Sequence, residues 1–209
     1  MIWWGGYKSS ILYSMKGKFI VLEGPDGSGT TTQSKLLAER LVSEGHDVVL
    51  TAEPTDSSIG KFIREQLKLK TIPSASALQL LFCADRAAHI ETVVKPALKA
   101  GKIVISDRYV ISTLVYGEAL GLDPDWLLRV NTPFLEPDVM MIALPSFPVC
   151  MERLKKRSQL DVFENAKFMR KVHDLYDRAI HDDQSIRHID TEKSVEAVAK
   201  EVYEAAMGR

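Results

Sequence analysis

The sequence of 209 residues is poor in cysteine, in net charge of either sign and in long apolar runs. Its two cysteines, Cys83 and Cys150, lie far apart, so their spacing predicts neither a disulfide framework nor a zinc site, and a reducing, cytoplasmic location is expected. The formal net charge is -1 without a basic block, which argues against a nucleic-acid partner. No apolar run approaches the ~20 residues that cross a bilayer, so no membrane association is expected.

Residues 1–14 differ from the rest of the chain. They include several aromatic side chains, carry one charge, and lack the apolar core and the small-residue cleavage site of a signal peptide. Met15 comes just before the first apolar run and could start the working domain. We therefore predict an N-terminal extension over residues 1–14, expected to be disordered, and a single domain over residues 15–209 without repeats or linkers.

Short apolar runs alternate with segments of helical periodicity. Five runs predict strands, at residues 19–22, 48–50, 103–105, 139–142 and 186–189. The first four are almost continuously apolar, as in parallel strands covered on both faces, whereas the last is mixed. Asp123, followed by a proline, marks a helix start, and apolar residues repeat at helical spacing over residues 195–202. The alternation predicts an α/β fold with a five-stranded parallel sheet flanked by helices on both faces.

A glycine-rich segment directly follows the first predicted strand and opens an apolar helix. Its residues are Gly24, Pro25, Asp26, Gly27, Ser28, Gly29, Thr30, Thr31 and Thr32. Its glycines allow backbone N–H groups to curl around an anion, and the helix N-terminus adds partial positive charge. Thr30 stands where such loops carry lysine, and Thr31 falls at the position of the Mg²⁺-ligating hydroxyl. The context predicts a phosphate-binding loop; the alternative is a glycine-rich turn without a ligand.

Several separated segments, in the same order, resemble the thymidylate kinase family. The loop with Asp26 resembles that family's phosphate loop, residues 80–86 resemble its thymine-binding helix, and Asp107-Arg108-Tyr109 matches its Asp-Arg-Tyr/His segment. The resemblance runs from about Met15 to the C-terminus. It implies a P-loop kinase fold with a short mobile lid, ATP as the phosphoryl donor bound by residues 24–32, Mg²⁺, and a homodimer.

The resemblance also implies an acceptor site for dTMP. Phe82 and Arg86 are four residues apart, so they share one face of a predicted helix. By the resemblance, the ring stacks on thymine and the guanidinium donates to a base carbonyl; the alternative is a core phenylalanine beside a surface ion pair. Tyr116 is implied to lie against the sugar and Asp26 to reach its 3′-hydroxyl. The remaining implied dTMP-binding residues are Glu53, Pro54, Arg108, Ser112 and Thr113.

Asp107 and Arg108 close the third predicted strand, where the carboxyl ends of parallel strands line a ligand crevice. We predict that both are catalytic, with Asp107 and Thr31 near Mg²⁺. The resemblance implies that Arg108 bridges the acceptor phosphate and the transferred group. The alternative is a helix-capping aspartate beside a surface arginine. Ala52 stands where bacterial relatives often have an arginine, so one acceptor-phosphate contact of the family is in question.

A basic cluster over residues 153–157 falls where the family's lid resembles this sequence, at about residues 153–164. A charge run of this kind is ordinarily a solvated helix face. The phosphate loop holds no arginine, so the lid-arginine type of thymidylate kinase fits better. We predict that Arg157, helped by Arg153 or Lys155, stabilises the charge of the transferred phosphoryl group and also replaces part of the function of the missing lysine.

The sequence thus predicts transfer of the γ-phosphoryl group of Mg·ATP to dTMP. Two alternatives stay open. The acceptor can be another nucleoside monophosphate such as dUMP, because one methyl group contributes only ~1–3 kcal/mol of discrimination. Alternatively, the protein binds nucleotides without useful catalysis, a hypothesis supported only by threonine at position 30.

Overall fold

A computed structural model describes residues 16–69, 74–156 and 165–208. The predicted N-terminal extension lies outside the described residues, as does the part of the predicted lid at residues 157–164, which includes Arg157. Within the described ranges, no helix is long and apolar enough to cross a membrane.

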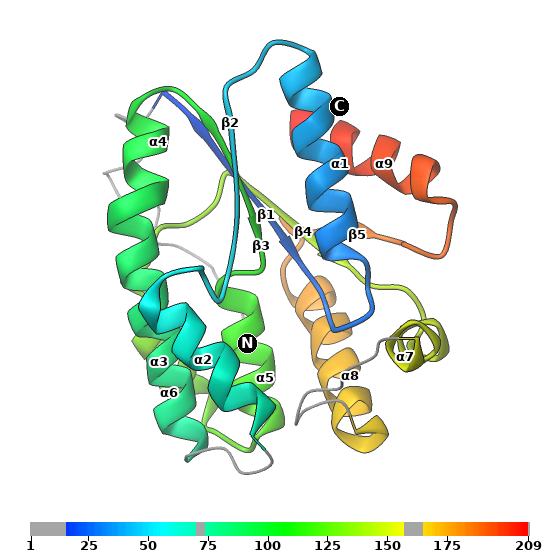
Figure 1. Ribbon diagram of the computed structural model, residues 1–209. Helices are drawn as coiled ribbons and strands as arrows, with labels where there is room; N and C mark the ends of the chain where they lie inside the picture. Colours follow the sequence, from blue (N-terminus) through cyan, green and yellow to red (C-terminus); the bar gives the residue numbers. More distant parts are fainter. Residues whose placement is uncertain (1–15, 70–73, 157–164, 209) are drawn as a thin grey trace.

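Five parallel strands form one sheet in the order β2-β3-β1-β4-β5, with β1 at its centre (Figure 1). All five strand predictions are confirmed, within a residue or two at each end. The bounds are β1 Lys18–Glu23, β2 Val48–Ala52, β3 Ile103–Asp107, β4 Val139–Ala143 and β5 Arg187–Ile189. The predicted α/β architecture of the P-loop kinase type is therefore what the chain adopts.

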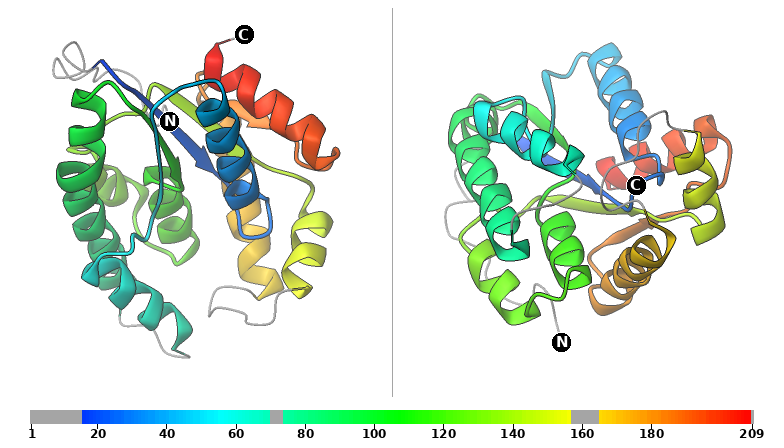
Figure 2. Two further views of the ribbon diagram at one scale, coloured as in Figure 1. Left: turned by 45° about the horizontal axis from the view of Figure 1, so that its top comes forward. Right: turned by 60° about the horizontal axis from the view of Figure 1, so that its bottom comes forward.

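Helices cover both faces of the sheet, as the two further views in Figure 2 make clear. Asp123 caps α6 as predicted, accepting from the Asp125 N–H, with Pro124 in the first turn. A π-helical turn, Ile90–Val94, joins α3 to α4. The helix bounds are α1 Thr30–Ser43, α2 Ser58–Lys68, α3 Ala75–His89, α4 Lys95–Lys99, α5 Val110–Ala119, α6 Pro124–Asn131, α7 Phe147–Lys155, α8 Ala166–Asp182 and α9 Val195–Met207.

The central strand β1 shows why its apolar run is continuous. Phe19 and Val21 pack into one core beside α4 and α5, whereas Ile20 and Leu22 pack into the opposite core beneath α1 and α9. Successive side chains of a strand point to opposite faces, so a strand buried on both faces needs apolar residues at every position. The sheet is thereby fixed between two helical layers.

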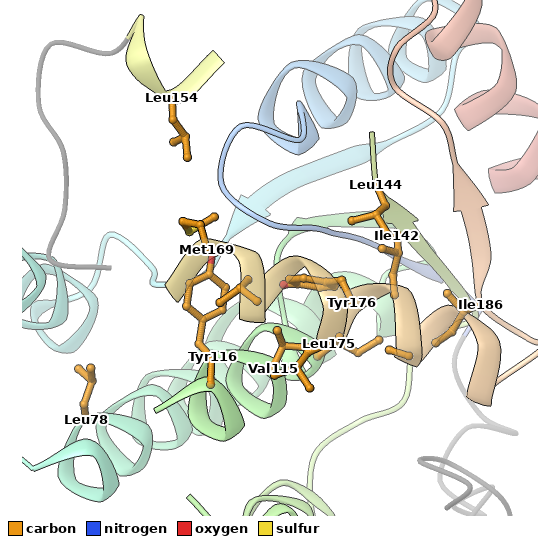
Figure 3. Close-up of a cluster of buried hydrophobic side chains, with 14 of the residues drawn as sticks. Leu78, Val115, Tyr116, Ile142, Leu144, Leu154, Met169, Leu175, Tyr176 and Ile186 are labelled. Carbon is orange, nitrogen blue, oxygen red and sulfur yellow. The ribbon is translucent and has the colours of Figure 1, made fainter. Parts of the chain in front are cut away.

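A third apolar cluster lies between α3, α5 and α8, next to the carboxyl end of β4. Figure 3 shows Tyr116 of α5 reaching toward Met169 of α8, with Leu78 of α3 on the other side. This cluster fixes α5 and α8 against each other. Its position matters because Tyr116 also belongs to the candidate site.

Candidate functional site

The site begins where β1, β2 and β3 end. Leu22 of β1 pairs with Asp107 of β3, and Ala52 of β2 pairs with the same residue, so three chain segments leave the sheet at one edge. These segments are the phosphate loop, Glu53-Pro54 and Asp107-Arg108. Asp26 and Arg108, which are 82 positions apart in the sequence, therefore meet because parallel strands share the direction of their carboxyl ends.

The phosphate loop has a backbone that depends on its glycines. Gly27 has φ 84°, and a Cβ atom there would lie 2.6 Å from the carbonyl oxygen of Cys150 in α7. Gly29 has φ 98° and immediately precedes α1. Left-handed conformations suit glycine, and the close approach of α7 leaves no room for a side chain. The curled loop thus ends at a helix N-terminus, where unpaired N–H groups favour an anion.

Thr30, in the position typical of lysine, is the first residue of α1 and is only 5% exposed. A cation nevertheless lies against the loop. Arg153 of α7 donates from Nη1 toward the carbonyl oxygens of Gly27 and Ser28, both at 3.4 Å. Its Nη2 donates to the Thr191 carbonyl oxygen at 2.7 Å. The structure therefore brings Arg153, a residue predicted to be catalytic, to the phosphate loop.

Thr31 and Asp107, the two predicted metal ligands, lie side by side. The Thr31 hydroxyl donates to Oδ2 of Asp107 at 2.5 Å. The other carboxylate oxygen of Asp107, Oδ1, is buried and has no partner among the described residues. A hydroxyl and a carboxylate are the oxygen ligands that Mg²⁺ prefers, and an unpartnered buried oxygen is a free coordination position. This pair of residues fits a magnesium ion.

Arg108 is held in a set direction by its backbone and by two side chains. It has φ 71°, in the left-handed region that is uncommon for residues other than glycine. Its Nη2 donates to Oδ1 of Asp26 at 2.6 Å, and its Nη1 donates to the Ser112 hydroxyl at 3.1 Å. Tyr116 donates its hydroxyl to the other oxygen of Asp26 at 2.8 Å.

The charge of Arg108 is secured by its surroundings. Burial opposes the charged form, but the negative charges of Asp26 and Asp107 act against it, and the pKa of the guanidinium is raised well above its ordinary value. Burial, followed by the charge of Asp26, raises the pKa of the Tyr116 phenol. Tyr116 therefore stays a neutral hydrogen-bond donor while Arg108 stays a cation. The cluster has a fixed pattern of donors and charges at neutral pH.

Glu23, the last residue of β1, is a site residue that the sequence reasoning missed. It is fully buried, and its Oε1 accepts from the backbone N–H groups of Tyr109 and Ser112 at 2.8 and 3.1 Å. Its Oε2 accepts from the hydroxyls of Ser112 and Tyr176, at 2.5 and 3.2 Å. Burial is the main cause of a raised pKa for this carboxyl group. The signal that could have found it is a carboxylate at the end of an otherwise apolar strand.

A cavity of about 270 Å³ opens beside this cluster. All the residues predicted to bind dTMP line it, together with Asp107. The lining residues assigned from the sequence are Asp26, Glu53, Pro54, Phe82, Arg86, Asp107, Arg108, Ser112, Thr113 and Tyr116. The structure adds lining residues that the sequence did not assign: Ala52, Arg64, Leu67, Gln79 and Tyr109. The cavity is large enough for part of a nucleotide and has both apolar and charged walls.

Arg86 lies deeper in the cavity wall than its predicted role suggests. It is 1% exposed and pairs with Glu53 through Nε at 2.9 Å. Its Nη1 donates to Asn131 at 2.5 Å, and its Nη2 donates to the Tyr109 carbonyl oxygen and the Thr113 hydroxyl, both at 2.8 Å. These bonds use four of the five guanidinium N–H groups. Within the described structure, one N–H of Nη1 is left for a ligand.

Arg64 supplies a third arginine to the cavity, from α2. Its Nη1 donates to the Pro54 carbonyl oxygen at 2.7 Å, and its Nη2 pairs with Asp56 at 2.8 Å. Ala52, where an arginine is common in bacterial relatives, lines the same cavity. Arg64 therefore brings a positive charge to the cavity in which Ala52 provides none.

Comparison with known proteins agrees with this geometry. A protein of Pyrococcus horikoshii named "probable thymidylate kinase" is 40% identical over 194 residues, which cover 90% of this chain and 95% of that protein. One of Methanocaldococcus jannaschii with the same name is 39% identical over 184 residues, covering 88% and 93%. The thymidylate kinase of Halothermothrix orenii is 37% identical over 204 residues, covering 93% and 98%. The model of the thymidylate kinase family matches residues 22–202, from the end of β1 into α9, and this chain belongs to that family.

Proposed function

We propose that the protein transfers the γ-phosphoryl group of ATP to the 5′-phosphate of dTMP, giving dTDP. The observation that carries this proposal is the junction of the phosphate loop with the cavity. Asp26 belongs to the loop, lines the cavity, and pairs with Arg108 at 2.6 Å. A phosphate bound by the loop and an acceptor in the cavity would therefore meet at this pair.

ATP is assigned to the loop side. The backbone N–H groups from Gly24 to the first turn of α1 would bind the phosphates of ATP. Thr31 and Asp107 would hold Mg²⁺, which would neutralise part of the negative charge of the phosphates. Arg153 supplies the cation that Thr30 cannot supply. The predicted part of Arg157 in this work stays a prediction, because its position lies outside the described residues.

dTMP is assigned to the cavity. Phe82 offers a ring for the base, and Tyr116 lies beside Asp26, where a deoxyribose would lie against both the ring and the carboxylate. Arg108 and Arg64 provide positive charge for the acceptor phosphate. Phosphoryl transfer of this kind needs little covalent catalysis by the protein. These residues would act by positioning the two substrates and by stabilising the negative charge of the transferred group.

The test is ADP release by the purified protein with Mg·ATP and, in turn, dTMP, dUMP, dCMP, AMP and GMP. We expect strong release with dTMP and background release with ATP alone. Strongest release with another monophosphate would keep the reaction class and overturn the acceptor. Background release throughout, with ATP still bound in a binding assay, would overturn the kinase assignment and favour a nucleotide-binding protein without catalysis.

A further inference from the structure

The wall of the cavity contains a buried amide side chain, that of Gln79, which makes no hydrogen bond within the described structure. It lies on α3, is 1% exposed, and lines the same cavity as Phe82 and Arg86. Neither Oε1 nor Nε2 has a hydrogen-bond partner among the described residues. Buried polar side chains are nearly always hydrogen-bonded, so an amide with both groups unpaired requires an explanation.

The position of Gln79 on its helix places it with the predicted base-binding residues. Residues 79, 82 and 86 are separated by three and four positions, so their side chains lie along one face of α3. Phe82 and Arg86 are both lining residues of the cavity. An uncommitted amide on this face is therefore next to the residues that would hold a base.

The polar side chains that contact Arg86 are occupied by their hydrogen bonds to it. Thr113 and Asn131 both accept from Arg86, and Glu53 pairs with Arg86 and contacts His89. Arg86 retains a single N–H. Of the polar side chains around Arg86, Gln79 is the one that offers both a free donor and a free acceptor within the described structure.

We propose that Gln79 recognises the hydrogen-bonding edge of the pyrimidine base. Its Oε1 accepts from the N3–H group, and its Nε2 donates to a carbonyl oxygen next to N3. An amide matches this edge because a donor and an acceptor stand side by side on each partner. Gln79 is then a specificity-determining residue, an inference that rests on the proposed dTMP kinase activity.

Binding and stability are expected to respond in opposite directions to the substitution Gln79→Met. Methionine has a similar length but no polar group. The variant should show a KM for dTMP raised by about 10- to 100-fold, because the base loses two hydrogen bonds in a buried site. The KM for ATP and kcat should stay within about threefold. The Tm of the free protein should rise, because an unsatisfied buried amide is removed.

N3-methyl-dTMP separates recognition of the base from general packing, because it lacks the N3–H group. In the wild type, methylation of N3 should raise the Kd, measured by calorimetry, by at least about tenfold. In Gln79→Met the same methylation should cost much less, because no acceptor remains to be lost. The matched control is Gln184→Met, the same chemical change at an exposed turn outside the cavity, which should behave as wild type.

Three results would overturn the role of Gln79. These are an unchanged KM and Kd for dTMP in Gln79→Met, a lowered Tm with KM for dTMP unaffected, or a variant that keeps the full sensitivity to N3 methylation. The wild-type assay separates this inference from the proposed function. If the wild type does not phosphorylate dTMP, the kinase assignment fails by itself, and calorimetry with dTMP still decides whether Gln79 contacts the base.

Discussion

Three arginines of the site are each oriented by a different kind of contact. Arg108 is set by a left-handed backbone and by Asp26, and Arg86 by a fully buried set of acceptors. Arg153 is set by main-chain carbonyl oxygens of the phosphate loop and of Thr191. A guanidinium whose direction is fixed before the substrates bind loses little entropy on binding them. We therefore expect cations held from other elements to take over the work of the missing loop lysine.

Arg153→Ala tests whether this residue serves the ATP side. The substitution removes the contacts to the Gly27 and Ser28 carbonyl oxygens, so positive charge beside the loop is lost. We expect kcat/KM for ATP to fall about 10- to 100-fold, with the KM for dTMP within about threefold. Initial rates at varied ATP and at varied dTMP measure both. Arg129→Ala, an exposed arginine on α6, is the control. An unchanged kcat/KM for ATP would show that another group replaces the lysine.

Residues inside a motif could be predicted from the sequence, and isolated residues could not. The loop, Asp107-Arg108 and Phe82 are parts of recognisable strings, and the cavity brings the predicted dTMP-binding residues together. Asn131 and Gln79 are isolated polar residues in helices, and the sequence alone does not distinguish them from polar residues on an exposed helix face. Only the packing of α3 against α5 and α6 reveals that both are buried.

At the scale of elements, Glu23 joins β1 to two helices. Its carboxylate accepts from the first turn of α5, through Tyr109 and Ser112, and from Tyr176 of α8. Ser112, Thr113 and Tyr116 all lie on α5. A single buried carboxylate at the end of the central strand therefore fixes the helix that carries three of the site residues against the phosphate loop.

Glu23→Gln is expected to change both activity and the pH dependence of stability. The amide keeps one acceptor but loses charge beside Arg108, so kcat/KM for dTMP should fall about tenfold. Burial raises the pKa of Glu23, so the folded state binds its proton more tightly than the unfolded state. The free energy of unfolding of the wild type should therefore fall, relative to the variant, as pH rises from about 4.5.

Urea unfolding of both proteins between pH 4 and 8 measures this difference, and the comparison cancels the titration of all other groups. A constant difference between wild type and variant across this range would contradict a raised pKa for Glu23. A variant with full activity would show that Glu23 does not position α5 for catalysis.

The strands could be predicted from the sequence, but their order in the sheet could not. Continuous apolar runs indicated β1, β3 and β4 because these strands are covered on both faces, whereas the equally apolar run of the edge strand β2 is only partly buried. The fifth run was mixed because β5 is a short edge strand in which Arg187 and His188 are exposed. The order β2-β3-β1-β4-β5 depends on pairings between distant segments, for which no local pattern exists.

At the scale of the whole molecule, the sheet carries the site and the helices around α3 carry an uncovered apolar surface. Phe62 on α2 and Leu80 on α3 are about half exposed, at 46% and 50%. These two helices pack against each other (Figure 1). Exposed large apolar side chains on adjacent helices are typical of an interface between protein chains. The predicted homodimer would bury them.

The homodimer can be tested through these two positions. We expect light scattering after gel filtration to give twice the chain mass of 23.4 kDa for the wild type. Phe62→Lys and Leu80→Lys should each shift the equilibrium to the monomer, because a lysine in an apolar interface is costly to desolvate. Val42→Lys is the control, since Val42 is 56% exposed on α1, outside these two helices. A monomeric wild type, or a dimer unaffected by both substitutions, would contradict this interface. Because α3 also carries Gln79, Phe82 and Arg86, loss of the dimer should raise the KM for dTMP more than the KM for ATP.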